Sequence, residues 1–109
     1  MTTTDPILAE ATRRLVEGFD PERIILFGSR ARGTGDAHSD YDLLVIFDTA
    51  DAQELRDLWL KMIGALHGVD APIDLLLMTP RQFEIDSQIP GQTARYARAD
   101  GKVLYERAA

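Results

Sequence analysis

Two short apolar runs, separated by a polar connector, constrain the fold of this chain more than any other feature. Residues 23–27 and 40–48 are rich in Ile, Leu, Val and Phe, and each run is short enough to be a buried strand rather than a helix. Gly, Ser, Arg and Asp make up much of the connector between them. We therefore expect two core strands with a polar site between them.

The first half of the connector carries the residue types that bind anions. Gly28 and Ser29 follow the first strand, where the absence of a Cβ on Gly28 lets the backbone approach a ligand closely. Arg30, Arg32 and Gly33 come next, so backbone N–H groups and guanidinium groups can face one anion. This arrangement predicts a phosphate-binding turn.

Two carboxylates stand at the start of the second strand. Asp40 and Asp42 are two positions apart, and such positions of an extended chain project from the same face. Two carboxylates that lie close together repel each other unless a cation lies between them. Mg²⁺ prefers oxygen ligands of this kind together with phosphate groups, so the pair predicts a magnesium site.

The combined pattern resembles the signature of a known superfamily. Gly28-Ser29, ten intervening residues and Asp40-Tyr41-Asp42 are similar to the Gly-Ser and Asp-x-Asp motifs of the nucleotidyltransferases that include DNA polymerase β. The compact form of the motif resembles the minimal nucleotidyltransferase (MntA-like) group. The resemblance implies that Asp40 and Asp42 hold two Mg²⁺ ions. It also implies that ATP is the substrate, with its phosphates on Gly28 and Ser29 and a contact from Arg30 or Arg32.

A third carboxylate interrupts another apolar run. Residues 73–78 read as a buried strand that contains Asp74, and an Asp in an apolar strand is costly unless a charge or a donor meets it. The resemblance implies that Asp74 completes the catalytic metal site. The alternative is that Asp74 lies on an edge strand and its side chain reaches water.

Length and composition limit the classes of protein. The chain has 109 residues, enough for one domain, here residues 1–109, and its formal net charge is −6. An acidic protein of this kind is not expected to grip a nucleic-acid duplex. The sequence has no cysteine, and we see no signal peptide or membrane-spanning run. We therefore expect a cytoplasmic protein.

The remaining segments predict helices that alternate with strands. Asp5 and Pro6 are start signals for an amphipathic helix that ends at Gly18. A second helix begins at Thr49 or Asp51, ends near residue 67 and packs Trp59 into the core or an interface. We further expect helices over residues 79–89 and 92–99 and a last strand over 103–105. The fold class is then a small α/β (α+β) nucleotidyltransferase domain, a mixed β-sheet with helices packed against it.

The resemblance also implies a partner. Minimal nucleotidyltransferases are paired with HEPN-domain toxins, and they act as antitoxins by attaching AMP to a tyrosine hydroxyl of the toxin. Two alternatives stay open. The chain could neutralise a toxin by binding alone, or it could be the catalytic subunit of a two-protein transferase that acts on a small molecule or an RNA end.

Overall fold

A single four-stranded sheet organises the computed structural model, which describes residues 5–36, 38–49 and 51–108. The strands are β1 (Arg23–Phe27), β2 (Tyr41–Ile46), β3 (Ile73–Met78) and β4 (Lys102–Glu106). They lie in the order β3-β2-β1-β4. The β1 strand is antiparallel to β2 and to β4, whereas β2 and β3 are parallel. The predicted mixed sheet is therefore confirmed.

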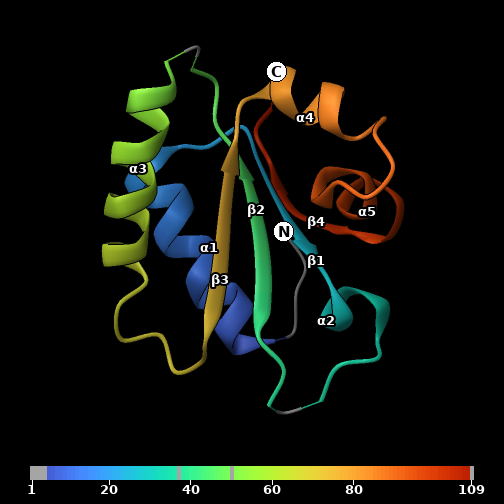
Figure 1. The fold of residues 1–109 in the computed structure, drawn as a ribbon. Coiled ribbons are helices and arrows are strands. Elements are labelled where there is room, and N and C mark those ends of the chain that lie inside the picture. Colours follow the sequence, from blue (N-terminus) through green and yellow to red (C-terminus); the bar gives the residue numbers. More distant parts are fainter. Residues whose placement is uncertain (1–4, 37, 50, 109) are drawn as a thin grey trace.

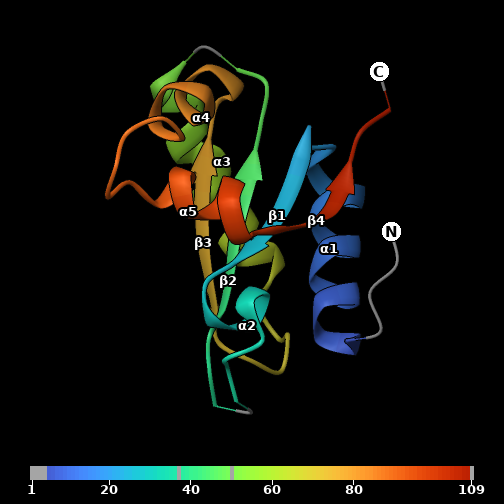
Figure 2. The same ribbon diagram turned by 90° about the vertical axis from the view of Figure 1, so that its right-hand side faces the viewer.

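Helices cover both faces of the sheet (Figures 1 and 2). They are α1 (Pro6–Phe19), α2 (Ser29–Arg32), α3 (Ala52–Ala65), α4 (Pro80–Asp86) and α5 (Thr93–Asp100). Buried residues of α1 and α3 share one core cluster with the sheet, and buried residues of α4 and α5 share another. In the part of the chain that the structure describes, no helix is both long and apolar enough to cross a membrane.

Strand residues alternate between these two cores, as the two-residue period of a strand requires. In β2, Leu43 and Val45 belong to the cluster under α1 and α3. Leu44 and Ile46 belong to the cluster under α4 and α5. The β2 strand is therefore apolar on both faces along most of its length, which explains its continuous hydrophobic run.

The predicted helix starts are confirmed. The Asp5 carboxylate accepts hydrogen bonds from the backbone N–H groups of Ile7 (2.9 Å) and Leu8 (3.5 Å), and Asp51 and Thr79 cap α3 and α4 in the same way. The predicted end of the first helix at Gly18 is wrong. The helix continues to Phe19, and Asp20 closes it in the left-handed conformation with φ 49°, which Asp tolerates better than most residues.

Other element ends also differ from the prediction. The α4 helix ends at Asp86 rather than at Ile89, because the chain turns after Ser87. Trp59 is 38% exposed, and its indole N–H donates a 2.8 Å hydrogen bond to the Leu75 carbonyl of β3. Trp59 therefore links α3 to the sheet through this hydrogen bond. The predicted core position is wrong, because the side chain is exposed, and the interface position stays a prediction.

Truncation of the core should cost far more than truncation of the surface. We expect Leu15→Ala to lower the free energy of unfolding by about 2–5 kcal/mol, because Leu15 of α1 is fully buried. The matched control is Leu60→Ala, which makes the same change in a helix at a side chain that is 59% exposed. Urea unfolding should detect a change of at most about 0.5 kcal/mol for this control. Equal losses for the two variants would contradict the described core.

Candidate active site

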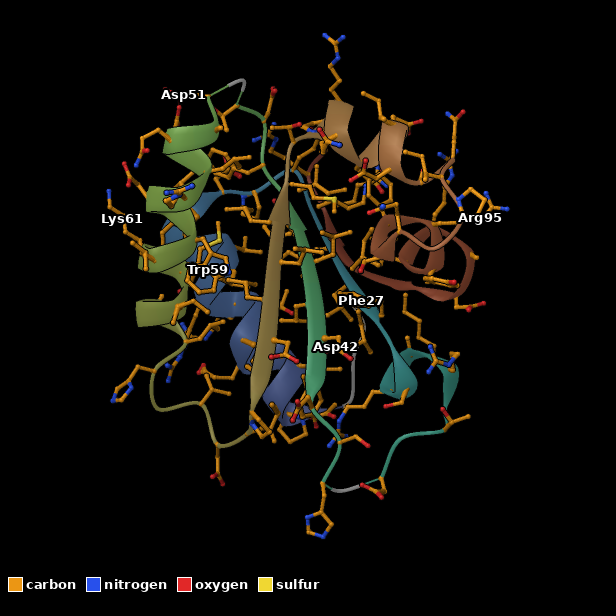
Figure 3. All side chains as sticks on the ribbon, viewed as in Figure 1. Phe27, Asp42, Asp51, Trp59, Lys61 and Arg95 are labelled. Atoms are coloured by element: carbon orange, nitrogen blue, oxygen red, sulfur yellow. The ribbon has the colours of Figure 1, made fainter. Side chains whose placement is uncertain are left out.

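The sheet brings the predicted carboxylates to one end and one face. Asp42 pairs with Phe27 in the antiparallel register with β1 and with Asp74 in the parallel register with β3. Asp42 and Asp74 lie on the face that packs against α4 and α5 further along the strands, because they are two residues before Leu44 and Leu76. In Figure 3, Asp42 lies near the start of β2, below α4 and α5. Asp40 precedes the strand and is exposed.

The Asp42 carboxyl interacts electrostatically with the other two carboxylates. Burial raises the pKa of Asp42 above its ordinary value, and the charges of Asp74 and Asp40 together with a hydrogen bond to Asp74 raise that pKa further. Arg32 opposes this shift. The arrangement is unfavourable for three bare carboxylates, and a bound cation would relieve it.

The carboxylates are therefore chemically suited to a hard divalent cation. Within residues 5–36, 38–49 and 51–108, no three His, Cys, Asp or Glu side chains are already gathered closely enough to hold a metal ion. Asp42 and Asp74 supply a pair of oxygen ligands on neighbouring strands, and Asp40 lies two residues before Asp42 at the start of β2. Asp74 also matches the alternative reading in part, since it is exposed on the edge strand β3.

Gly28 makes room for the Asp42 carboxylate. A Cβ on Gly28 would overlap the Asp42 Oδ2, and the Gly28 backbone has φ 76° and ψ −159°, a region that is essentially restricted to glycine. The sequence predicts that this glycine lets a ligand approach the backbone closely. The structure adds that the group which comes closest is a carboxylate of the chain itself.

The turn after β1 holds Ser29 beside the connector. The Ser29 carbonyl accepts hydrogen bonds from the backbone N–H groups of Thr34 (3.0 Å) and Gly35 (3.1 Å). A Cβ on Gly35 would lie 3.1 Å from the Ser29 hydroxyl and 3.2 Å from the Ser39 hydroxyl. Both hydroxyls therefore converge on the Gly35 backbone, and Ser29 is only partly buried.

The two arginines of the connector have different surroundings. Arg30 places its guanidinium carbon 3.8 Å from the centre of the Tyr41 ring, and its Nε donates a 2.9 Å hydrogen bond to the Ser39 carbonyl. Arg32 is exposed and acts electrostatically on Asp42. Arg32 is thus freer than Arg30 to contact a phosphate near the carboxylates.

Behind the motif, Tyr41 contacts the cap residue of the first helix. The Tyr41 hydroxyl donates a 2.7 Å hydrogen bond to the Asp5 Oδ2. Burial acts to raise the pKa of Asp5, but this bond and those from Ile7 and Leu8 outweigh it, so the pKa lies below its ordinary value. The Tyr41 side chain is packed in the core, with an exposed fraction of 4%. The sequence signals the ring burial and the helix cap, but not that the two residues meet.

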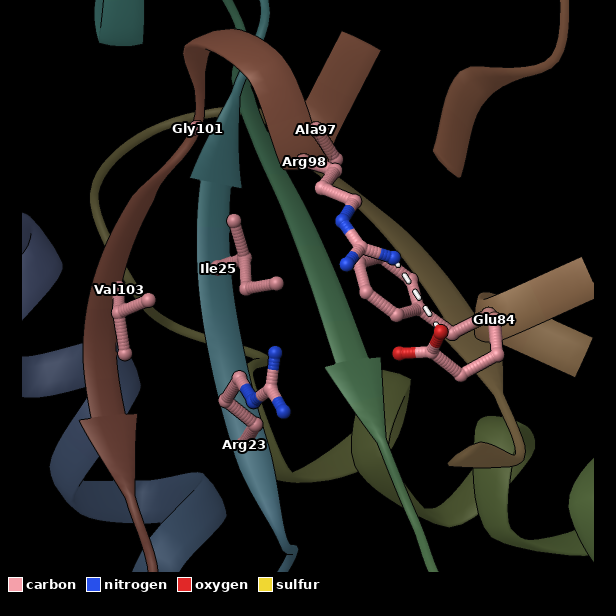
Figure 4. A pocket seen from close by; sticks show the side chains of 8 residues that line it. Arg23, Ile25, Glu84, Ala97, Arg98, Gly101 and Val103 are labelled. Carbon is pink, nitrogen blue, oxygen red and sulfur yellow. Dashed lines mark hydrogen bonds and ion pairs between the residues drawn. The ribbon is translucent and has the colours of Figure 1, made fainter. Parts of the chain in front are cut away.

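A separate pocket lies along the first half of β1, between β4 and the helices α4 and α5 (Figure 4). It has a volume of about 230 Å³, and Arg23, Phe83 and Arg98 are among its lining residues. Arg98 forms an ion pair with Glu84 at 3.2 Å, which the dashed line in Figure 4 marks. Because Arg23 begins β1 and Gly28 follows its end, this pocket is distinct from the carboxylate site.

Sequence comparison places the chain among nucleotidyltransferases. Residues 10–109 match the family model of the polymerase beta nucleotidyltransferases. The chain is also 36% identical over 99 residues to a candidate protein adenylyltransferase of Methanocaldococcus jannaschii. The alignment covers 83% of this chain and 62% of that protein, so the chain spans about three fifths of the length of this relative.

Solved structures with the same fold agree. A candidate nucleotidyltransferase of Sulfolobus solfataricus superposes with a TM-score of 0.64 over 92% of this chain and 78% of that one, at 20% identity, which shows the fold alone. A toxin–antitoxin complex with AMP-PNP contains a chain that is 27% identical, with a TM-score of 0.53 over 92% of this chain and 73% of that one. A mutant MntA toxin–antitoxin complex contains a chain that is 25% identical, with a TM-score of 0.55 over 91% of this chain and 72% of that one.

The glycine–serine turn, the strand with Asp42 and the neighbouring strand with Asp74 thus occur in a chain that matches the family model over residues 10–109. We conclude that this chain belongs to the polymerase beta nucleotidyltransferase family.

Proposed function

We propose that this chain is a Mg²⁺-dependent adenylyltransferase that moves AMP from ATP to a hydroxyl of a partner protein and thereby acts as an antitoxin. The observation that carries the proposal is the parallel register that pairs Asp42 with Asp74, beside the Gly28–Ser29 turn. The candidate protein adenylyltransferase of M. jannaschii and the toxin–antitoxin complex with AMP-PNP support it. The cytoplasm, where ATP is abundant, is the expected location.

The side chains of the site have separate roles in this proposal. Asp40, Asp42 and Asp74 hold the Mg²⁺ ions, which, when bound, supply positive charge for the attacking and leaving oxygens of an in-line displacement. Gly28 and Ser29 position the triphosphate, and Arg32 offsets part of its charge. Asp74 lies at the sheet edge, where an acceptor hydroxyl can approach, and it favours loss of the hydroxyl proton.

We propose that the acceptor is a tyrosine of a HEPN-domain toxin. The named toxin–antitoxin complexes support a partner of the toxin class, and the tyrosine and the HEPN domain rest on the family resemblance of the motif. Because Asp74 is exposed on the edge strand β3, the chain can present its site to a folded protein.

Labelled ATP tests the transfer directly. The purified chain and Mg²⁺ should be incubated with a HEPN-domain toxin and with ATP that carries the label on either the α- or the γ-phosphate. We expect only the α-label to enter the partner, because transfer of AMP releases the other two phosphates as pyrophosphate. Peptide mass spectrometry should locate the label on tyrosine. Neutralisation of the partner without any transferred label would favour the binding antitoxin, and label on a small molecule or RNA would favour the two-protein transferase.

Replacement of one carboxylate should separate catalysis from folding. We expect Asp42→Asn to lower label transfer roughly a hundredfold or more, since the ion that it helps to hold supplies several kcal/mol of charge stabilisation. The free energy of unfolding should rise, because a like-charge contact with Asp74 is removed. Asp48→Asn, at an exposed carboxylate beyond the end of β2, should leave both quantities unchanged. Transfer at the wild-type rate by Asp42→Asn would contradict the proposed role.

A methyl group on Gly28 should displace the Asp42 carboxylate. We expect Gly28→Ala to lower label transfer by roughly a hundredfold, because small misplacements of a catalytic group have effects of this size. Gly91→Ala is the control, since Gly91 also has a positive φ (89°) but nothing lies within 4 Å of the added Cβ. Both variants should lose some stability in urea unfolding. Equal transfer rates for the two variants would show that the contact between Gly28 and Asp42 does not matter.

A further inference from the structure

We propose that Asp5, Arg30 and Tyr41, here called the tyrosine cluster, position Asp40 for cation binding. The inference rests on the proposed function, because it assigns positioning residues to the same site. It gives Arg30 a role that depends on its shape and its hydrogen bond rather than on its charge alone.

Asp40 lies where strand pairing does not determine its direction. The register of β2 with β3 begins at Tyr41, and the register of β2 with β1 begins at Asp42. Asp40 is exposed, whereas Tyr41 next to it is 4% exposed. A ligand carboxylate has to be held close to its productive direction by its surroundings. For Asp40, the neighbouring residues 39 and 41 are the available supports.

Both neighbours of Asp40 are fixed by the tyrosine cluster. Arg30 donates from Nε to the Ser39 carbonyl at 2.9 Å and stacks its guanidinium on the Tyr41 ring at 3.8 Å. The guanidinium of Arg30 therefore contacts both the Ser39 carbonyl, which precedes Asp40, and the Tyr41 side chain, which follows it. The Tyr41 N–H also donates to the Pro72 carbonyl at 3.0 Å, which ties this segment to the start of β3.

Asp5 connects the cluster to the first helix. Its Oδ1 accepts from the first turn of α1, and its Oδ2 accepts from the Tyr41 hydroxyl at 2.7 Å. The Tyr41 side chain thus has a hydrogen-bonded end as well as a stacked face, and both restrict its rotation. The cluster joins α1, α2 and the start of β2, elements that are distant in the sequence.

Direct cation binding tests the cluster without relying on turnover. Mn²⁺, followed by electron paramagnetic resonance, reports the dissociation constant in the absence of ATP. We expect Arg30→Lys to weaken Mn²⁺ binding about tenfold, as loss of a group that orients a ligand typically does. Lysine keeps the charge but has neither the planar stack nor an Nε placed for Ser39. Arg56→Lys on the exposed surface of α3 is the control and should bind Mn²⁺ as the wild type does.

Variants that remove the hydrogen bond between Tyr41 and Asp5 test the other end of the tyrosine cluster. We expect Tyr41→Phe to weaken Mn²⁺ binding about threefold to tenfold, since one hydrogen bond is lost. Tyr105→Phe removes the same atom from partly buried Tyr105 of β4, away from the site, and should have no effect. Asp5→Ser should behave like Tyr41→Phe, because Ser still caps α1 but is too short to reach Tyr41. High Mn²⁺ concentration should restore label transfer by all three cluster variants, which a merely unstable protein would not show.

The possible results separate the two proposals. Wild-type Mn²⁺ affinity in stably folded Arg30→Lys and Tyr41→Phe would overturn the positioning role. So would an affinity loss that simply follows the fraction of unfolded protein in urea unfolding. If the wild type binds Mn²⁺ but transfers no label, the adenylyltransferase proposal fails while the cluster variants still decide the positioning role. If the wild type binds no Mn²⁺, both proposals fail.

Discussion

The contact between two carboxylates, Asp42 and Asp74, determines much of what surrounds the site. Like charges that are partly removed from water oppose folding, and the parallel register of β2 and β3 nevertheless places them side by side. The core strands stabilise this arrangement, because residues 43–46 of β2 are buried by helices on both faces of the sheet. The fold thus holds two mutually repelling carboxylates, Asp42 and Asp74, at the position where the proposed reaction needs a cation.

The same contact explains the sequence around β1. Gly28 has to lack a side chain because the Asp42 carboxylate occupies that space. Its unusual backbone angles then turn the chain sharply into α2, and this helix carries Arg32, whose charge acts on Asp42. The glycine, the short helix and the acidic strand therefore form one unit, and a change in any of them alters the others.

Most of the architecture could be predicted from the sequence, and the reasons are physical. Residues 23–27 and 73–78 were predicted as strands with the observed bounds, because apolar runs bounded by turn residues leave few alternatives. The starts of α1 and α4 could be predicted because the side chains of Asp5 and Thr79 can accept hydrogen bonds from the backbone N–H groups of a first helical turn. The first helix end was misplaced because Asp20, and not a glycine, adopts the left-handed conformation. The prediction that Asp40, Asp42 and Asp74 bind metal stays a prediction.

Contacts between distant segments were beyond sequence reasoning. The bond between Asp5 and Tyr41 joins residues 36 positions apart, and nothing in the spacing of residues reveals which polar groups meet in three dimensions. The environment of Arg30 was likewise not predictable, since an arginine after a glycine–serine turn fits a phosphate contact equally well. Such contacts depend on how the first helix packs against the finished sheet.

The hydrogen bond from Trp59 to Leu75 has a consequence for self-association. The β3 strand is at the edge of the sheet, and an edge with free backbone groups is a template onto which another chain can add a strand. The indole N–H of Trp59 donates a hydrogen bond to the Leu75 carbonyl of this strand. Asp74, which carries a carboxylate, is the residue before Leu75. Trp59, which links α3 to the sheet, and Asp74, a residue of the proposed catalytic site, therefore both make the addition of another strand at this edge less favourable.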